Sequence, residues 1–499
     1  MRLVVVSNRV AVPNASAGQA GGMTVGIVGA LKTHGGLWLG WSGQLIESTT
    51  AQPHRHVDGA VEYVTLDLPA TEFQGYYAGF ANQVLWPLFH GRCDLVAYNR
   101  AAYESYLAIN ALFADELARA LRPDDVVWVH DYHLIPLAHG LRARGVRNRI
   151  GFFLHTPFAD PDDLMRLPVG DSVAEFLCAY DLVGLQTSAD LQAFREFLAL
   201  RPLANRRGPL RLAVPPRSDA FPIGIDTEEF EDTAATAVIE DPALVAAFER
   251  VKPDATPIIA VDRLDYSKGI AERVCALETF FYLHPEFARK VSLIQVAPVG
   301  RSEIPAYRNE AARVKHAFDA LKTIQDWGDV PPAQLLTDGV DRRSLAAAYR
   351  RSRVAMVTPL RDGMNLVAKE YVAAQDPDDP GVLVLSRLAG AANELDVGAI
   401  LVDPCDPEDV AQALHRALIM PLAERQQRWR RMIAVLRHND AAYWSSRFVA
   451  ALARVERLEA RTPARPLASG QGTRSRVPVV WKDAHGAPLA VELTAGRAR

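Results

Sequence analysis

The sequence VAMVTPLRDGMNLVAKEYVAAQDPDDPGVLVLS, at residues 354–386, decides the fold. Residues 354–358 form an apolar run that predicts a buried strand, and a turn follows from Pro359 onward. Apolar periodicity then predicts a helix that Asn365 caps and that ends at Asp376-Pro377, before a second buried strand at residues 382–385. Strand, turn, helix and strand in this order form the unit that builds parallel sheets.

The turn between this strand and helix has the features of an anion-binding site. Gly363 would let the backbone approach a ligand closely, and the free N–H groups at the helix start would face a negative charge. Glu370, about one and a half turns further on, would accept hydrogen bonds from both hydroxyls of a ribose. An ordinary βα turn with a surface glutamate is the alternative, and this stretch alone leaves both interpretations open.

Length and composition describe a globular protein with two domains. The chain has 499 residues, too many for one compact domain, and 49% of them are hydrophobic and 23% charged. A net charge of −4 argues against binding nucleic acid through bulk electrostatics, and no apolar run approaches the roughly 18 residues that a membrane span needs. The N-terminal apolar segment is too short for a signal peptide.

The four cysteines lie far apart and form no C-x-x-C pair: Cys93, Cys178, Cys275 and Cys405. This spacing is typical of a reducing compartment and predicts neither a disulfide framework nor a thiolate metal site. We therefore expect a soluble cytoplasmic enzyme whose partners are small-molecule substrates, with no nucleic-acid or membrane partner. A homo-oligomer remains open.

Predicted strands alternate with predicted helices in both halves of the chain. They lie at residues 3–6, 126–129, 150–154, 182–185 and near 221, and then at 257–261, 293–297, 354–358, 382–385 and 400–402. The predicted fold is therefore α/β, with two doubly wound Rossmann-like domains that face each other across a cleft. The dinucleotide fingerprint G-x-G-x-x-G is absent, which counts against a nicotinamide or flavin enzyme.

The acidic, irregular segment after residue 225 marks the predicted domain boundary. We expect an N-terminal domain at residues 1–225, a C-terminal domain at 226–440, and a helix at 441–460 that packs back across the domains. Residues 461–499 are basic and rich in Pro, Gly and Ser, which predicts that most of this tail is disordered. Within it, residues 477–483 and 488–493 could pair as a small hairpin.

Polar residues follow six of the predicted strands, at the edge of the sheet where ligands of parallel α/β proteins bind. The six groups are Ser7-Asn8-Arg9, His130-Asp131-Tyr132-His133, His155-Thr156-Pro157, the run from Asp262 to Gly269, Pro298-Val299-Gly300-Arg301 and Arg361-Asp362-Gly363. Six such groups at strand ends predict one site rather than scattered surface residues.

Two cations in the second half suit a diphosphate. Arg263 and Lys268 lie five residues apart on one strand-end loop and, with the helix start at Gly363, would stabilise the charge of a departing diphosphate. Either residue alone would more simply be a solvated surface cation. The repeated strand-end placement favours the binding interpretation for the pair.

Residues of the first half suit a phosphorylated sugar. Arg9 and Arg301, from the two halves, would clamp a phosphate between the domains. Asp131 would hold sugar hydroxyls, and His155 would hydrogen-bond the sugar that is transferred. Aromatic residues in irregular sequence, such as Tyr77, could stack against a sugar, although most aromatics of this region must be core.

Metal catalysis and serine catalysis find weaker support. His130, Asp131, His133 and His155 are suitable ligand types, but the helical H-E-x-x-H spacing is absent. No G-x-S-x-G elbow for a nucleophilic serine occurs either. We predict no metal and no cofactor.

Long, uncommon motifs identify a family that the chain resembles. They are VVVSNRVA, the GG before MTVGIVGAL, GLWLGWSG, VLWPLFH, VWVHDYHL, IGFFLHTPF, FPIGID, DRLDYSKG and TPLRDGMNLVAKEYVAAQDP with GVLVLSRLAGAA. From residue 2 to about residue 460, the chain resembles the trehalose-6-phosphate synthases, retaining glycosyltransferases of the GT-B architecture. The resemblance implies transfer of glucose from a nucleotide-glucose, usually UDP-glucose, to glucose 6-phosphate, without a metal or a covalent enzyme intermediate.

The resemblance also implies which residues form the site. Positions that hold glucose 6-phosphate are Arg9, Tyr77, Asp131 and Arg301. Nucleotide-sugar positions are Gly21, Gly22, Arg263, Lys268, Val340, Asp362, Gly363, Met364, Asn365, Leu366, Val367, Ala368, Lys369 and Glu370. Positions tied to selection of the α anomer are Trp86 and Thr156, and the catalytic set is Asp131, His155, Arg263, Lys268 and Asp362.

The chain departs from the family pattern on the side that would bind the base. The usual GRING segment and the Trp-Thr-Pro stretch after it are absent from residues 319–336, the aromatic at the next nucleotide position is Val340, and the usual branched aliphatic at position 156 is Thr156. UDP, GDP and ADP donors therefore remain open. A regulatory homologue with weak catalysis and a relative that joins a cyclitol phosphate are the alternative functions.

Overall fold

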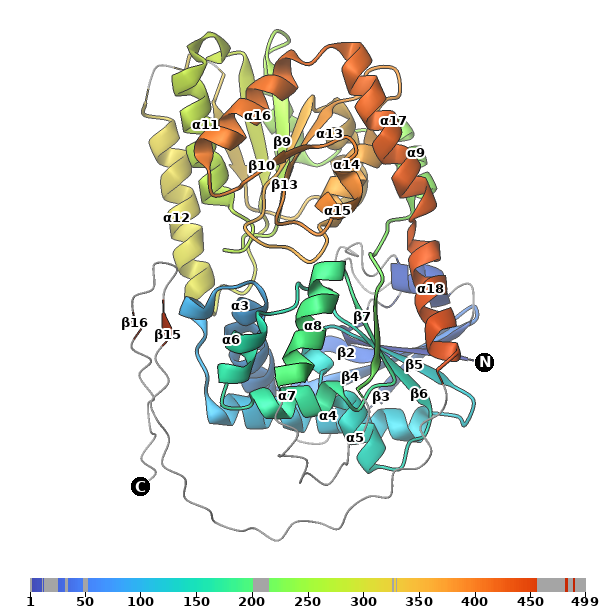
Figure 1. The fold of residues 1–499 in the computed structure, drawn as a ribbon. Helices are drawn as coiled ribbons and strands as arrows, with labels where there is room; N and C mark the ends of the chain where they lie inside the picture. The colour runs from blue at the N-terminus through green and yellow to red at the C-terminus, as the bar shows by residue number, and fades with distance from the viewer. Residues whose placement is uncertain are drawn as a thin grey trace.

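The computed structural model describes residues 2–10, 12, 26–31, 35–47, 53–200, 215–324, 327–328 and 330–455, together with the backbone of residues 481–482 and 488–489. Two β-sheets, each flanked by helices, lie one above the other in Figure 1. Neighbouring strands are parallel in both sheets except where β3 meets β4. The predicted fold class of two doubly wound α/β domains is confirmed.

The first sheet has eight strands in the order β3-β4-β2-β1-β5-β6-β7-β8. Their bounds are β1 Leu3–Arg9, β2 Gly36–Ile46, β3 Pro53–Asp58, β4 Val61–Pro69, β5 Val126–His130, β6 Arg149–Phe153, β7 Leu182–Leu185 and β8 Arg217–Ala220. The helices of this half are α2 Ala70–Phe73, the π-helix η1 Gln74–Leu85, α3 Trp86–Phe89, η2 Cys93–Leu95, α4 Arg100–Ala120, η3 Tyr132–Leu134, α5 Leu137–Ala143, α6 Pro161–Arg166, α7 Gly170–Leu177 and α8 Ser188–Leu200. Residues 26–31 are also helical.

The second sheet has six parallel strands in the order β11-β10-β9-β12-β13-β14. Their bounds are β9 Thr256–Val261, β10 Val291–Val296, β11 Ala333–Leu336, β12 Val354–Val357, β13 Val382–Ser386 and β14 Ile400–Val402. The helices are α9 Thr227–Thr236, α10 Pro242–Glu249, α11 Ile270–Leu283, η5 Pro285–Phe287, α12 Pro305–Leu321, α13 Arg342–Arg351, α14 Leu366–Ala374, α15 Ala392–Leu395, α16 Pro407–Ile419, α17 Leu422–His438 and α18 Ala441–Ala453.

The stretch at residues 354–386 folds as its pattern predicts. Strand β12 is followed by a turn, by α14 and by β13, and β12 and β13 pair in parallel from Val354 opposite Val382. The side chain of Asn365 accepts a hydrogen bond from the N–H of Ala368 at 3.2 Å, which makes it the helix cap that was expected.

The last helix of the described chain returns from the second half to the first. Figure 1 shows α17 beside the upper domain and α18 beside the lower one. The ring of Phe448 on α18 stacks on that of Trp128 in β5, with ring centroids 4.7 Å apart. A Cβ added at Gly151 or at Gly184 would lie 2.7 Å from the Phe448 ring, so these two glycines leave the space that the ring fills.

The chain passes between the domains at two places, and these crossing segments touch. A Cβ added at Gly224 would lie 2.2 Å from the carbonyl oxygen of Asn439. Beside them, the buried ammonium of Lys369 donates to the carbonyl of Ile223 at 2.8 Å and to the Glu394 carboxylate at 2.5 Å. Asn439 also donates to Glu394, at 2.9 Å. One buried polar network therefore links both crossings to α14.

Several elements differ from the sequence prediction. Strands β2, β3, β4 and β11 were not predicted, and the segment around Tyr77, predicted to be irregular, is the π-helix η1. Helix α18 ends at Ala453, earlier than expected. The predicted hairpin is confirmed by β15 Trp481–Lys482, which pairs antiparallel with β16 Pro488–Leu489, while the predicted disorder of the remaining tail concerns positions outside the described residues. No described helix contains an apolar stretch long enough to cross a bilayer.

Candidate active site

A cluster of cations lies where the two domains meet. The guanidinium of Arg263 lies 5.0 Å from the centre of the Trp86 ring, and that of Arg301 lies 4.6 Å from it. Both arginines come from the second domain, from the loops after β9 and β10, whereas Trp86 begins α3 of the first. Cation–π attraction therefore helps to hold two like charges close together beside one indole.

Asp265 is the counter-ion of this cluster. It is almost fully buried, and one carboxylate oxygen accepts the N–H of Ser267 at 2.9 Å. Burial on its own would raise the pKa of Asp265, but the charges of Arg263 and Arg301, helped by Lys268, outweigh it and hold the pKa at about 2. The carboxylate is thus ionised at every physiological pH.

Lys268 forms the third cation of the site and is held by Asp362. The ammonium lies 2.5 Å from the Asp362 carboxylate, which also accepts from the Asn365 side chain at 3.1 Å. Burial would raise the pKa of Asp362, but the charge of Lys268 lowers it below its ordinary value. The amides of Leu366 and Val367 at the start of α14 have no acceptor among the described residues, so this end of the helix is open to an anion.

Gly363 brings the two domains into direct backbone contact. A Cβ added at Gly363 would lie 2.1 Å from the carbonyl oxygen of His155, and one added at Gly390 would lie 1.9 Å from the Gly363 carbonyl oxygen. The space that the missing side chain leaves is therefore filled by the protein's own backbone. The contact between the domains therefore requires glycine at position 363, in addition to the predicted close approach of its backbone to a ligand.

Asp131 is held in a strained position at the end of β5. Its φ of 72° lies in a region that favours glycine, and its carboxylate accepts the N–H of His155 at 3.3 Å. Burial raises the pKa of Asp131 to about 6, although backbone hydrogen bonds and the charges of Arg301 and Arg263 oppose the rise. Asp131, predicted to bind glucose 6-phosphate, therefore lies near both arginines and near His155, predicted to bind the nucleotide-sugar.

His155 is paired with a second histidine. Its Nε2 lies 3.0 Å from Nδ1 of His130, and the two rings stack with centroids 5.3 Å apart. Burial lowers the pKa of His155 to about 3, so the ring is neutral in the physiological range.

A row of rings runs along the first domain from Arg9 toward Arg301. The Arg9 guanidinium lies 5.7 Å from the Trp41 ring, and the Arg301 guanidinium lies 5.8 Å from the Tyr77 ring. Ring contacts join the two ends: Trp41 with Phe73 at 4.5 Å, Phe73 with Tyr77 at 5.1 Å, and Trp41 with Tyr77 at 6.5 Å. Three of the four residues predicted to hold glucose 6-phosphate, Arg9, Tyr77 and Arg301, are therefore joined by one row of rings.

Glu370 lies half-buried in α14, where burial raises its pKa to about 7. Arg342 at the start of α13 opposes this rise and Glu229 of α9 adds to it, while Arg342 and Glu229 form an ion pair of 2.7 Å. A carboxylate in this state titrates close to physiological pH. Such a shift marks a candidate binding group.

Some side chains of the predicted nucleotide-sugar segment point away from the site. The Lys369 side chain is fully buried and both of its hydrogen bonds go to the network at the domain crossing, so a contact of Lys369 with a nucleotide would come from its backbone. The amide of Ala368 is already taken by Asn365. Met364 and Val340 have buried side chains, which leaves only their backbones for a nucleotide. Gly21 and Gly22 lie outside the described residues.

Two buried polar atoms at the predicted anomer-selecting positions have no partner among the described residues. They are Nε1 of Trp86 and Oγ1 of Thr156. A Cβ added at Gly363 would also meet the carbonyl carbon of Thr156 at 2.8 Å, so this threonine lies against the donor-side turn. Unpaired buried polar atoms cost free energy, and a ligand hydroxyl would relieve that cost.

Three residues of the site were missed by the sequence prediction. Asp265 stands within the DRLDYSKG motif but was not distinguished from its neighbours. His90 is buried, donates from Nδ1 to the Trp86 carbonyl at 2.8 Å, and has its ring centre 4.0 Å from the Trp86 ring. Arg273 is buried in α11 and binds Asp262, Gln295 and Thr358 at the ends of three strands. The sequence of α11 gave no indication that Arg273 is buried, because a single arginine in a helix is usually exposed.

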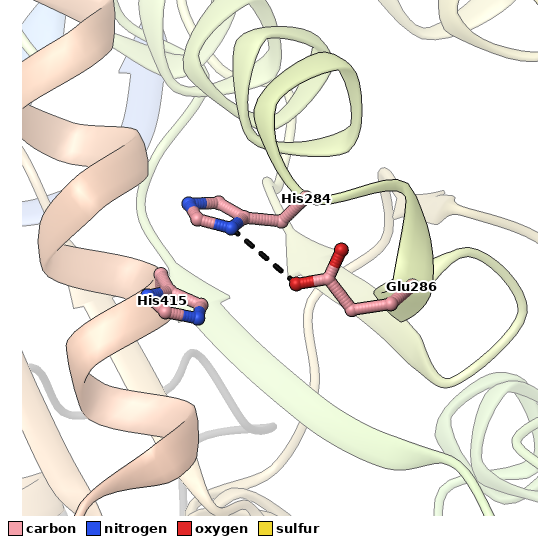
Figure 2. A group of neighbouring side chains, drawn as sticks. All are labelled: His284, Glu286 and His415. Carbon is pink, nitrogen blue, oxygen red and sulfur yellow. Dashed lines mark ion pairs between the residues drawn. The ribbon is translucent and has the colours of Figure 1, made fainter.

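One group of three potential metal ligands occurs among the described residues, away from this site. Figure 2 shows His284, Glu286 and His415 together; they come from the C-terminal end of α11, from η5 and from α16. Helix α11 begins just after Lys268 and has 14 residues, so this group lies roughly 20 Å from the Lys268 loop. The two imidazole rings stack face to face, 3.8 Å apart and within 3° of parallel. Their in-plane lone pairs therefore do not converge on one point, and a shared ion would require the rings to turn.

Comparison with known proteins places these observations in a family. Residues 2–454 match the sequence model of Glycosyltransferase family 20. A trehalose-6-phosphate synthase of Klebsiella pneumoniae is 45% identical over 459 residues, which cover 90% of this chain and 94% of that protein. A synthase structure from Burkholderia xenovorans in complex with glucose-6-phosphate, and an E. coli structure bound with UDP-2-fluoro glucose, each superpose with a TM-score of 0.84 at 43% identity, and cover 91% of this chain and 100% of theirs.

Proposed function

The chain belongs to glycosyltransferase family 20, and we propose that it transfers glucose from UDP-glucose to glucose 6-phosphate with retention, giving α,α-trehalose 6-phosphate. The similar structures that hold glucose-6-phosphate and UDP-2-fluoro glucose support both substrates. The observation on this chain that carries the proposal is the meeting of Arg263, Arg301 and Lys268 where the domains join. Such a cluster is suited to a phosphorylated donor and a phosphorylated acceptor together.

The acceptor is assigned to the first domain, residues 1–225. Arg9 and Arg301 would bind the phosphate of glucose 6-phosphate, and Tyr77 lies between them on the aromatic surface. Asp131 would accept hydrogen bonds from sugar hydroxyls, a role supported by its position beside Arg301 and the His155 amide.

The donor is assigned to the second domain, residues 226–440. Arg263, Lys268 and the amides of Leu366 and Val367 would bind the diphosphate, and Glu370 would bind the ribose hydroxyls. Lys268 pairs with Asp362, so a bound diphosphate would share the lysine with that carboxylate.

In the chemical step, the bond between C1 of glucose and the diphosphate oxygen breaks, and its electron pair stays on the diphosphate. Arg263, Lys268 and the helix start stabilise the charge that develops there. The anomeric hydroxyl oxygen of glucose 6-phosphate forms the new bond to C1 from the same face, and its proton passes to the departing phosphate oxygen. Such fixed cations accelerate the reaction only to the extent that they bind the transition state more strongly than the bound donor.

An activity panel tests the proposed function. Purified enzyme would be incubated with glucose 6-phosphate and UDP-, GDP- or ADP-glucose, with and without chelator, and trehalose 6-phosphate would be measured. We expect turnover with UDP-glucose, because the relatives are UDP-forming, despite the altered residues around Val340. No product with any donor would overturn the proposal in favour of a regulatory homologue.

A substitution tests the role of the cations. Arg263→Ala should lower kcat by about a hundredfold to a thousandfold, as loss of one charge-stabilising group does in other enzymes, while KM for glucose 6-phosphate changes little. Arg416→Ala, an exposed arginine of α16, is the matched control and should leave both constants unchanged. Equal losses in kcat and acceptor affinity would contradict the assignment of Arg263 to the leaving group.

We also assign the enzyme to the cytoplasm. All four cysteines are described and none forms a disulfide. This is typical of reducing compartments.

A further inference from the structure

His130 contacts the site without facing a substrate. It is the last residue of β5, is fully buried, and has its ring centre 4.5 Å from that of Trp128. Its Nδ1 lies 3.0 Å from Nε2 of His155, and its Nε2 is buried without a hydrogen-bond partner among the described residues. Within the part of the chain that the structure describes, the single polar contact of this buried ring therefore goes to a residue of the proposed donor site.

The pair must share a single proton between the two facing nitrogens. Burial lowers the pKa of both His130 and His155, so each ring carries one N–H at neutral pH. Either Nδ1 of His130 donates to Nε2 of His155, or Nε2 of His155 donates to Nδ1 of His130. The second arrangement would leave an N–H at the buried Nε2 of His130.

The surroundings of His130 favour the first arrangement. Two other buried N–H donors of the same aromatic pocket, Nε1 of Trp128 and Nε1 of Trp444, already have no acceptor among the described residues. A third unpaired donor would add a further desolvation cost, and buried orphan N–H groups are rarer than buried unused acceptors. A lone pair at Nε2 of His130 avoids this cost.

We propose that His130 is a positioning residue that fixes the tautomer of His155, so that His155 presents its Nδ1–H as a donor to an oxygen atom of the glucose being transferred. Nε2 of His155 is engaged with His130, which leaves Nδ1 as the one ring nitrogen for a ligand. The inference rests on the proposed function for the identity of the ligand. The tautomer itself follows from the protein alone.

The tautomer is tested by nuclear magnetic resonance on full-length protein labelled with 15N-histidine. Signals of His155 are identified by their loss in His155→Gln. We expect the proton of His155 on Nδ1 and an unprotonated Nε2, with no substrate present. A proton on Nε2 overturns the proposal. This arm does not need turnover, so it stays informative if the proposed reaction fails.

Two substitutions test the positioning role. His130→Leu removes the donor, whereas His130→Asn keeps an N–H close to the place of Nδ1. We expect kcat to fall by about tenfold to a hundredfold in His130→Leu, with KM for glucose 6-phosphate within about twofold, and to recover most of the loss in His130→Asn. The Leu variant should also shift the His155 proton between its nitrogens.

The same kinetic measurements on a control histidine show whether any loss of a histidine side chain lowers kcat. His139→Asn, a half-buried histidine of α5 packed on Phe176, should leave kcat unchanged. A folded His130→Leu variant with normal kcat overturns the proposal. So does a folded His130→Asn variant that is no better than His130→Leu, since a purely steric role would not distinguish a donor from an apolar side chain.

Discussion

Single carboxylates keep the cations of this site in place before a substrate arrives. Asp265 lies among Arg263, Arg301 and Lys268, and Asp362 pairs with Lys268. Without these anions, three like charges at a domain junction would repel each other and hold the domains apart. A diphosphate bound as proposed would enter a site whose positive charge is partly balanced, so its binding would exchange existing ion pairs for new ones.

Glu370 should give donor binding a pH dependence near neutrality. Its pKa of about 7 means that the carboxylate is mostly protonated at pH 6 and mostly ionised at pH 8. Only the ionised form accepts hydrogen bonds from both ribose hydroxyls. We therefore expect KM for UDP-glucose to fall by roughly five- to tenfold between pH 6 and pH 8, as the ionised fraction rises.

Steady-state kinetics at a series of pH values check this expectation. In Glu370→Gln the midpoint near pH 7 should vanish and KM should stay at its low-pH value or above. The same sigmoid in Glu370→Gln would show that another group controls donor affinity.

Lys369 should matter for stability and not for donor binding. Lys369→Met leaves the Glu394 carboxylate buried without its cation, which costs about 3–5 kcal/mol in comparable buried pairs. We expect the free energy of unfolding in urea to fall by that order, while KM for UDP-glucose of the folded enzyme changes by less than about threefold. Lys315→Met, which removes an exposed pair on α12, is the control and should leave the free energy of unfolding almost unchanged. Normal stability with a raised KM would show that the Lys369 side chain binds the donor.

At the scale of elements, the turn before α14 is one place where the backbones of the two domains touch. The carbonyl of His155, at the end of β6, occupies the place of a Cβ on Gly363. The same turn presents the N-terminus of α14 and the Lys268–Asp362 pair. This backbone contact therefore contributes to the alignment of the two domains, together with the contacts of Arg263 and Arg301 with Trp86.

Gly363→Ala should separate the two halves of the site. The added methyl would lie 2.1 Å from the His155 carbonyl oxygen, so the domains must move apart or the turn must deform. We expect kcat/KM to fall by at least about a hundredfold, because misplacement by 1 Å already costs about that much. Near-normal activity in Gly363→Ala would contradict the alignment role.

Elements that are buried on both faces could be predicted from the sequence, and others could not. Strands such as β12 and β13 are short apolar runs, which is what a covered parallel sheet requires. Strand β3, PHRHVD, is exposed along its length and carries no apolar alternation, so only its pairing with β4 makes it a strand. The π-helix η1 needs the close contact of Gly75 and Gly79 with α4, which no local pattern announces.

The residues of the candidate site also divide into those that the sequence could predict and those that it could not. Residues at strand ends, such as Arg263, Arg301 and Asp131, could be predicted, because parallel topology brings strand ends together. The position of Lys369 in the motif suggested a ligand, but its side chain points to the other side of α14, to the domain crossing. Side-chain direction depends on packing between distant segments, as Arg273 and its three strand-end partners also show.

At the scale of the whole molecule, helix α18 connects the two domains, because it follows the second domain in the chain and packs on the sheet of the first. Phe448 and Trp444 of this helix pack on Trp128 and Phe153 of the first sheet, although the chain before them belongs to the second domain. The first domain is therefore built from both ends of the described chain.

Phe448→Ala should destabilise the first domain. Loss of a fully buried phenylalanine costs about 3–5 kcal/mol, and the glycines at 151 and 184 cannot fill the cavity. We expect that decrease in the free energy of unfolding in urea, followed by the fluorescence of the nearby tryptophans. Tyr443→Ala on the exposed side of α18 should cost less than about 1 kcal/mol. Equal effects of both substitutions would mean that α18 does not complete the core.

The position of α18 also bears on how the protein is made. A ribosome releases the eight strands of the first sheet early, but the helix that covers Trp128 and Phe153 only after the second domain has been synthesised. The first domain to be translated is thus the last to be completed, and until then one apolar face of its sheet is open to solvent. Such a nascent surface is a binding site for chaperones and a starting point for aggregation, so the yield of folded enzyme should depend on the rate of translation through residues 226–453.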